Sequence, residues 1–182
     1  MYIDRILYPV TALGPGERAV LWVAGCSRKC AGCANPELWA QHPEQYLAPE
    51  TLAGYVNGLT DQTIDGITIT GGEPFDQAAE LVRFLGALSF QAEVLIFTGY
   101  AREELEREDC FLELLNRTDV LVDGPYLKEA NDKKAALRGS LNQKIHYLNP
   151  DAEAKYEQYL KKGRQIQNFV YEYRVLLVGI HK

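Results

Sequence analysis

Short apolar segments at a regular spacing are the feature that most constrains the fold of this chain. Runs of branched and aromatic residues occupy positions 20–24, 66–70, 94–98 and 120–122. Most of these runs are bounded by glycine, which is typical of buried strands. The last three begin about 27 residues apart, the length of a strand, a helix and two loops. This spacing predicts parallel βα units in an α/β fold.

The segments between these runs have the pattern of helices. Apolar residues at helical spacing predict a helix over 75–88, and leucines among many charges predict one over 102–116. A proline in the first turn and a glycine near the end favour a helix over 49–59. The N-terminal segment 3–8 is predicted to be a strand, followed by a turn at Gly14-Pro15-Gly16. Near the C-terminus we expect a helix at 151–162 and two strands over 165–178, around Glu172.

Length and charge narrow the class of protein. The chain has 182 residues and a net charge of −6 without a basic block, which argues against nucleic acid as the main partner. No apolar stretch approaches the roughly 20 residues that span a bilayer, and no targeting segment is visible. We therefore expect one domain over 1–182, located in the cytoplasm and not bound to a membrane.

Three of the four cysteines stand within eight residues, directly after the first of these runs. They form a Cys-x-x-x-Cys-x-x-Cys motif at Cys26, Cys30 and Cys33. Three thiolates on one loop can bind a single [4Fe–4S] cluster, which ordinarily takes four cysteines. The missing fourth ligand leaves one iron with an open position. The histidines lack the spacing of a structural zinc site, the main alternative, and Cys110 is expected to be a small buried hydrophobic residue.

Polar turns follow the next three strands. They contain Gly71, Gly72, Glu73 and Pro74, then Thr98, then Asp123. The carboxyl ends of parallel strands carry the active site in barrels and open α/β sheets. These residues are therefore candidates for binding a cofactor, although turn and capping roles are equally typical of them.

Taken together, the motifs carry a resemblance. A Cys-x-x-x-Cys-x-x-Cys motif after a first strand, followed by Gly-Gly-Glu-Pro, is similar to the signature of radical S-adenosylmethionine (SAM) enzymes. Within them, residues 8–148 resemble the activating proteins of anaerobic (class III) ribonucleotide reductases. The motifs that carry this likeness are a Gly-Pro-Gly turn, an Asn35…Trp39 segment, Thr-Gly-Tyr, Val-Leu-Val-Asp-Gly and Arg138-Gly-Ser-Leu-Asn-Gln143.

The resemblance implies a mechanism and a set of partners. SAM would bind the free iron of a [4Fe–4S] cluster held by Cys26, Cys30 and Cys33. One electron would then cleave it to methionine and a 5′-deoxyadenosyl radical that makes a glycyl radical on a large partner enzyme. The implied cofactor-binding residues are Asn35, Gly71, Gly72, Glu73, Pro74, Thr98 and Asp123, and no catalytic residue is assigned beyond the cluster and SAM. The implied electron donor is similar to flavodoxin or ferredoxin.

Length bears on the shape of this fold. A complete (β/α)₈ barrel needs about 250 residues, so we expect a partial, laterally open barrel of the radical SAM type. An open side suits a macromolecular substrate that closes the site itself. Residues 149–182 form an extension beyond the resemblance, and its tyrosines either pack onto the core or form a docking surface.

Two other functions stay open at this stage. One is a small radical SAM enzyme that modifies another peptide or protein. The other is an iron–sulfur protein that is not an enzyme.

Overall fold

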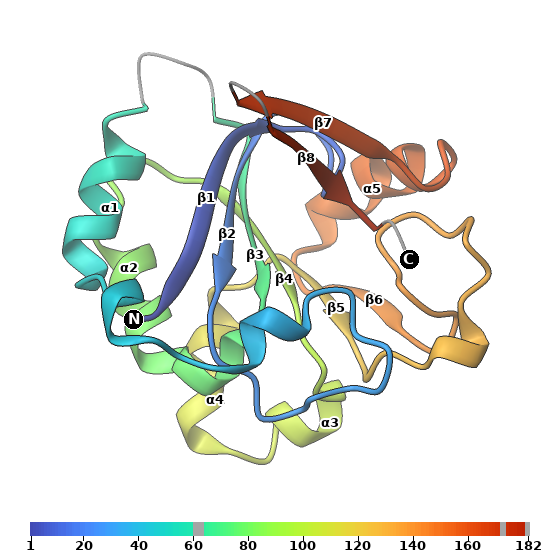
Figure 1. Cartoon of the computed structure of the whole chain (residues 1–182), viewed down its shortest axis with the longest axis horizontal. Helices are drawn as coiled ribbons and strands as arrows, with labels where there is room; N and C mark the ends of the chain where they lie inside the picture. The colour runs from blue at the N-terminus through green and yellow to red at the C-terminus, as the bar shows by residue number, and fades with distance from the viewer. Residues whose placement is uncertain (60–63, 172–173, 181–182) are drawn as a thin grey trace.

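A computed structural model describes residues 1–59, 64–171 and 174–180 of the chain. The described part is built on a six-stranded sheet with helices and short 3-10 turns around it (Figure 1). Its strands are β1 (Ile3–Val10), β2 (Arg18–Val23), β3 (Gly66–Gly71), β4 (Glu93–Phe97), β5 (Val120–Asp123) and β6 (Lys144–Tyr147). Its helices are α1 (Pro49–Asn57), α2 (Ala78–Gly86), α3 (Arg102–Leu105), α4 (Asp109–Asn116) and α5 (Glu153–Leu160).

The order of strands in the sheet follows the order in the chain. β2, β3, β4 and β5 are parallel neighbours, whereas β1 and β6 are antiparallel edge strands. The parallel βα units predicted from the spacing are confirmed. In the described part of the chain the sheet stays open between β1 and β6 and is not closed into a barrel.

The two faces of the sheet are covered differently. Helices α1, α2 and α4 cover one face, where alternate residues of the strands such as Leu21, Ile67 and Ile69 join Leu81 and Phe84 in the main core. The other face carries Val20, Trp22 and Leu95, and it is partly covered by α5 and by a two-stranded hairpin. The parallel strands β2 to β5 are therefore buried on both faces, as the continuous apolar runs predicted, whereas the edge strands β1 and β6 are partly exposed.

The segment 102–116 departs from the single helix expected of it. It forms α3 and α4, separated by residues 106–108. The break turns α4 so that Phe111 packs edge-on to Phe75, with ring centroids 5.6 Å apart. Leu114 and Leu115 are buried farther along α4, but Cys110 in its first turn is exposed to solvent, so the expectation of a buried Cys110 was wrong.

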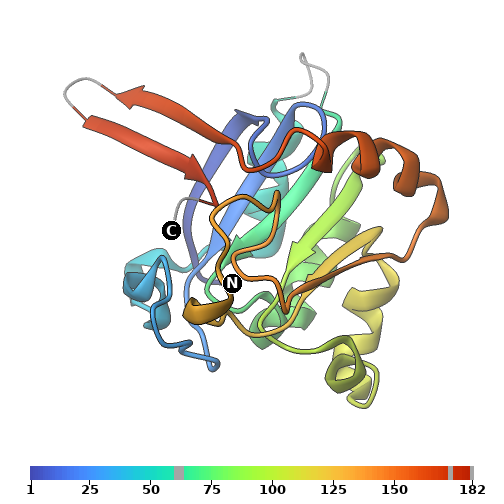
Figure 2. The ribbon, with the colours of Figure 1, turned by 90° about the vertical axis from the view of Figure 1, so that its right-hand side faces the viewer.

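The C-terminal extension folds back onto the sheet. A short 3-10 turn (Pro150–Ala152) leads into α5, and β7 (Ile166–Tyr171) pairs with β8 (Arg174–Gly179) in a hairpin that projects from the body (Figure 2). Tyr156 and Tyr159 are buried, so the expectation that they pack the extension onto the core is confirmed. The side chain of Tyr171 and residues Glu172 and Tyr173 lie outside the described part.

Arg18 is the first residue of β2, at the end of the sheet where the parallel strands begin. Its side chain lies on the face away from α1 and α2. Its side chain is fully buried and donates to Thr68 Oγ1 (2.6 Å), to Glu93 Oε1 (2.9 Å) and to three backbone carbonyls. Tyr156 donates to the same Glu93 oxygen at 2.7 Å. The Gly14-Pro15-Gly16 turn supplies one of these carbonyls, so it closes the end of the sheet opposite to the cysteine loop.

No helix in the described ranges is both long and apolar enough to cross a lipid bilayer.

We predict that Arg18→Ala lowers the free energy of unfolding by about 3 to 5 kcal/mol, because it leaves buried polar partners without their donor. Chemical denaturation of the purified protein measures the change. Arg83→Ala is the matched control, since Arg83 pairs with Glu50 at the surface and such pairs contribute little. Equal effects of the two substitutions would contradict this account.

Candidate functional site

The three cysteines of the motif lie on the loop that follows β2. The side chains of Cys26, Cys30 and Cys33 are half-buried. Lys29 and Gly32 have φ angles of 44° and 76°, so the loop turns tightly just before the second cysteine and again between the second and the third. The loop therefore presents all three thiols near one surface of the protein.

The donor set of this loop fits an iron–sulfur cluster. Thiolates are the usual ligands of such clusters, and hydrogen bonds to their sulfur tune the reduction potential. The backbone N–H of Asn35 donates to Cys33 Sγ at 3.4 Å. In the described residues no three Cys, His, Asp or Glu side chains gather around one point as they would around a single metal ion. A [4Fe–4S] cluster does not need that arrangement, because each thiolate binds a different iron.

Backbone hydrogen bonds close the base of the loop. The N–H groups of Gly25 and Cys26 donate to the carbonyls of Leu38 and Trp39, at 2.8 and 3.2 Å. Leu38 is buried within the 3-10 turn Pro36–Trp39. The two ends of the loop are thus held together before any cofactor binds.

Asp76 anchors the middle of the loop from the turn that follows β3. Its carboxylate accepts hydrogen bonds from the N–H of Ser27 (2.7 Å), from Ser27 Oγ (2.8 Å) and from Tyr100 Oη (3.2 Å). The Arg28 guanidinium lies 4.6 Å from the centre of the Tyr100 ring and 3.5 Å from Glu104. Nothing in the sequence pattern links Asp76 to Ser27, because the two residues are 49 positions apart in the chain.

The glycine turn after β3 lies directly against the turn that leads into the cysteine loop. Gly72 N–H donates to Val23 O (2.7 Å) and Glu73 N–H to Gly25 O (2.8 Å). A Cβ atom on Gly72 would lie 2.0 Å from Gly25 O, and Gly71 has a φ of 108°. Both positions therefore require glycine, and the contact fixes the glycine turn beside the cysteines.

Glu73 is buried, and its carboxylate is directed into the protein. It accepts hydrogen bonds from Thr98 Oγ1 (2.7 Å), Gly99 N–H (2.8 Å) and Phe75 N–H (3.1 Å). Burial raises the pKa of Glu73 to about 7, although these hydrogen bonds oppose the shift. Glu73 and Thr98 thus join the ends of β3 and β4, and Pro74 begins the 3-10 turn Pro74–Gln77.

Asp123 is also buried at the end of its strand. Its carboxylate accepts the N–H of Arg102 at the start of α3 (2.7 Å), and His146 Nε2 lies 3.1 Å from its other oxygen. The Arg-Gly-Ser-Leu-Asn-Gln segment binds the turn that follows. Gln143 accepts from Gly139 N–H and donates to Gly124 O, at 2.8 and 3.0 Å.

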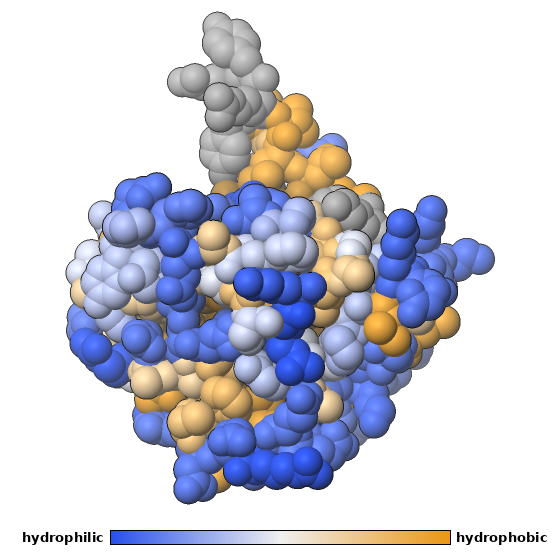
Figure 3. All heavy atoms as spheres, turned by 60° about the horizontal axis from the view of Figure 1, so that its bottom comes forward, coloured by the Kyte–Doolittle hydropathy of each residue, from blue (hydrophilic) through white to orange (hydrophobic). Residues whose placement is uncertain are grey.

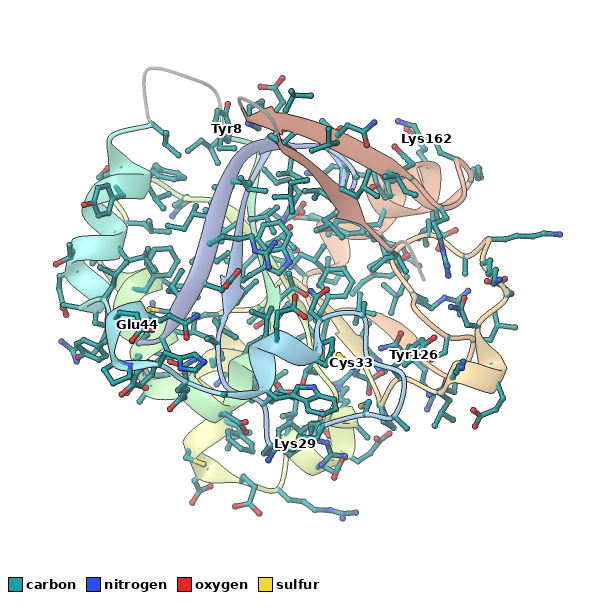
Figure 4. The ribbon with its side chains drawn as sticks, viewed as in Figure 1. Tyr8, Lys29, Cys33, Glu44, Tyr126 and Lys162 are labelled. Atoms are coloured by element: carbon teal, nitrogen blue, oxygen red, sulfur yellow. The ribbon has the colours of Figure 1, made fainter. Side chains whose placement is uncertain are left out.

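A cavity of about 470 Å³ opens beside the cysteine loop. Cys33, Asn35 and Gly71 are the proposed site residues that line it. Figure 4 shows Cys33 and Tyr126 close together below the hairpin, whereas Lys29 points away from it. Cys26, Cys30, Gly72, Glu73, Pro74, Thr98 and Asp123 are not among the lining residues.

The sequence reasoning did not identify several other residues of this cavity. Trp22 and Phe97 form its floor on the open face of the sheet, and Gln143 and the β8 strand line it from other elements. Trp22 and Phe97 are ordinary strand residues in the sequence, so no local signal distinguishes them. Gln143 ends the Arg-Gly-Ser-Leu-Asn-Gln motif, which is the one signal available for it, whereas Tyr126 stands outside the motifs quoted above.

The loop and its fold define a protein with a single iron–sulfur cluster site. A family model described as a 4Fe-4S single cluster domain matches residues 12–146. Anaerobic ribonucleoside-triphosphate reductase-activating proteins are similar to the chain over most of their length. The one from Enterobacteria phage T4 is 35% identical over 163 residues, covering 86% of this chain and 100% of the relative. Those of Escherichia coli K12 and Vibrio cholerae are 32% and 33% identical, covering 78% and 76% of this chain and 96% and 94% of the relatives.

The chain therefore belongs to the 4Fe-4S single cluster domain family and, within it, to the anaerobic ribonucleoside-triphosphate reductase-activating proteins. This family membership confirms the resemblance to the activating proteins that the sequence motifs indicated. The iron–sulfur cofactor follows from the same family match.

We predict that Glu73→Gln changes how stability depends on pH. The folded protein holds the Glu73 proton more tightly than the unfolded chain, so this residue stabilises the fold fully below about pH 4.5 and loses that contribution as the pH rises through about 7. Relative to Glu73→Gln, the parent should lose roughly 2 to 3 kcal/mol between pH 4.5 and pH 8. Urea denaturation of the cluster-free protein at both pH values measures this difference. Parallel pH profiles for parent and variant would refute the prediction.

We also predict that Asp76→Ala weakens retention of the cluster, because it removes the three hydrogen bonds that hold Ser27 and Tyr100. Iron release to a chelator from the reconstituted protein should be several times faster than in the parent. Asp109→Ala, an exposed aspartate in the first turn of α4, is the control and should leave the rate unchanged. The prediction fails if both variants release iron at the parent rate.

Proposed function

We propose that the chain is a radical SAM enzyme that generates a glycyl radical on an anaerobic ribonucleoside-triphosphate reductase. The observation that carries the proposal is the contact between the cysteine loop and the glycine turn, beside the cavity. It brings a three-thiol ligand set and a stretch of exposed backbone to one place. The names of the relatives supply the partner enzyme.

In this proposal Cys26, Cys30 and Cys33 bind three irons of a [4Fe–4S] cluster, and SAM binds the fourth. The bound cluster and SAM would supply one-electron chemistry, in which one added electron converts SAM to methionine and a 5′-deoxyadenosyl radical. Transfer of one α-hydrogen from glycine to that radical would give 5′-deoxyadenosine and the glycyl radical. The cavity walls would exclude water from that transfer once the partner enzyme closes the open side.

The remaining site residues divide into two roles under this proposal. Gly71 and Gly72 offer backbone groups to the ammonium end of SAM, and Asn35 contacts SAM from the cysteine loop. Glu73, Pro74 and Thr98 hold the glycine turn in place, since their side chains are engaged within the protein. Asp123 is assigned to binding of the ribose or the methionine carboxylate of SAM. To bind there, its carboxylate must release the N–H of Arg102 and contact SAM instead.

We further propose that the open sheet is the partial, laterally open barrel of the radical SAM type. Four parallel strands whose carboxyl ends meet the cysteine loop support this. The electron donor is proposed to be similar to flavodoxin or ferredoxin, and the exposed Lys29 next to Cys30 suits an acidic protein of that kind. The cytoplasm, where cysteines stay reduced, is the proposed location.

A second candidate is a radical SAM enzyme that modifies a different peptide or protein. The observation that favours it is the length of the chain. The alignment covers 100% of the phage T4 relative but only 86% of this chain, so this chain has residues that the relative lacks.

The proposal predicts that the reconstituted protein, with SAM and dithionite under anaerobic conditions, forms 5′-deoxyadenosine. With the reductase from the same genome it should also give a glycyl radical doublet in the EPR spectrum. Cys26→Ala should reduce both products by at least about 100-fold, because the cluster loses a ligand. Cys110→Ala is the matched control and should behave as the parent, since Cys110 is exposed on α4.

The outcomes separate the alternatives. No 5′-deoxyadenosine from the parent would leave an iron–sulfur protein that is not a radical SAM enzyme. Formation of 5′-deoxyadenosine without a glycyl doublet on the reductase would favour a different substrate.

A further inference from the structure

One side of the cysteine loop is in contact with the segment that follows β5. A Cβ atom on Gly32, between the second and third cysteines, would lie 3.6 Å from Cε1 of Tyr126 and 3.3 Å from Cδ of Lys128. Tyr126 and Cys33 also line the same cavity, and Figure 4 shows the two close together. The ring of Tyr126 is therefore a wall of the candidate cluster site, on the side of Cys33.

Much of the cysteine loop itself is exposed. Ser27, Lys29 and the small residues Ala31, Gly32 and Ala34 all face solvent. Polar side chains predominate on this side of the molecule, which comes forward in Figure 3. A cluster bound by the half-buried cysteines would thus lie close to water, and its exposure would depend on the groups that flank the loop.

The Arg-Gly-Ser-Leu-Asn-Gln segment (138–143) holds the turn that carries Tyr126. Three hydrogen bonds join it to the backbone on either side of Tyr126: Gln143 Nε2 to Gly124 O (3.0 Å), Asn142 Nδ2 to Pro125 O (2.8 Å) and Leu127 N–H to Ser140 Oγ (3.1 Å). A Cβ atom on Gly139 would lie 3.0 Å from Cδ2 of Tyr126, so this glycine leaves room for the ring to pack against the segment. The backbone before and after Tyr126 is thus fixed, and its ring lies against the cysteine loop.

The C-terminal extension contributes to the same support. Arg164, which follows α5, donates from Nη2 to Asn131 Oδ1 (3.1 Å) and to Arg138 O (3.0 Å), and its N–H donates to Lys134 O (2.8 Å). Asn131 Nδ2 in turn donates to Tyr126 Oη at 3.3 Å. A continuous set of hydrogen bonds therefore runs from the extension to Tyr126.

We propose that the ring of Tyr126 covers the Cys33 side of the bound iron–sulfur cluster, and that the segment 138–143 positions the ring there. The inference deepens the proposed function and rests on its iron–sulfur cluster. Solvent exposure and the groups around a cluster set its reduction potential. Reduction adds negative charge, which water stabilises, so a cluster without this cover should be reduced at a less negative potential. It should also release iron faster, because a chelator reaches it more easily.

Removal of the ring is the direct test. In the reconstituted protein, Tyr126→Ala should shift the reduction potential of the cluster to a less negative value, as measured by redox titration followed by EPR. It should also release iron to a chelator roughly tenfold faster than the parent. Tyr126→Phe should behave as the parent in both measurements, because it keeps the ring and loses only the hydroxyl. Tyr55→Ala is the matched control and should change neither, since Tyr55 is 65% exposed on α1.

A double-mutant cycle tests the role of the segment. Gln143→Ala removes the hydrogen bond to Gly124 O and the two that Gln143 accepts from the N–H groups of Gly139 and Ser140. It should shift the potential and the rate of iron release in the same direction as Tyr126→Ala, by a smaller amount. Because Gln143 acts through the ring, Gln143→Ala should add no further change in a protein that already carries Tyr126→Ala. Additive effects would contradict the positioning role of the segment.

Failure of this inference differs from failure of the proposed function. Formation of 5′-deoxyadenosine tests the radical SAM activity, whereas the potential and the iron release are measured without SAM. The inference is wrong if Tyr126→Ala keeps the potential and the iron-release rate of the parent, or if Tyr126→Phe changes both as much as Tyr126→Ala does. Thermal unfolding of the cluster-free variants checks that they fold. Tyr126→Leu, which should give smaller changes in the same direction, replaces Tyr126→Ala if that variant does not fold.

Discussion

The close approach of two backbone turns is the constraint on which the candidate site depends. Gly72 packs against Gly25 so closely that a single added carbon would overlap the carbonyl oxygen. The two hydrogen bonds beside it, from Gly72 and Glu73, extend the pairing of β2 with β3 past the ends of both strands. The cysteine loop and the glycine turn are thereby placed by the ladder of a parallel sheet, which is among the most rigid parts of a protein.

Around this contact, side chains act mainly as supports. Glu73 joins the glycine turn to Thr98 and Gly99, and Asp76 joins it to Ser27 in the cysteine loop. Most conspicuous polar residues of the motifs thus hold backbone in place and do not line the cavity. Backbone groups that cannot rotate suit a cofactor bound through several atoms, because little conformational entropy is lost on binding.

The C-terminal extension gives the open face of the sheet a partial cover. Its helix is fastened at the N-terminal end of the strands, where Tyr156 shares Glu93 with Arg18. Its hairpin then crosses to the side where the cavity opens (Figure 1). The two ends of the extension thus serve different purposes: one closes the base of the sheet, and the other borders the site.

Much of this protein follows from its sequence alone. Apolar runs at a constant interval are enough to predict parallel strands, because each run must be buried on both faces, and three cysteines within eight residues are enough to predict the cluster site. Cys110, the break between α3 and α4, the partners of Glu73 and Asp76, and the position of β8 were decided by tertiary packing. These features depend mainly on contacts between residues 24 or more positions apart, and such contacts leave no periodic signal in the chain. The local pattern therefore predicted the elements and the candidate cluster ligands, whereas only the folded sheet determined which polar groups face the cavity and which hold it together.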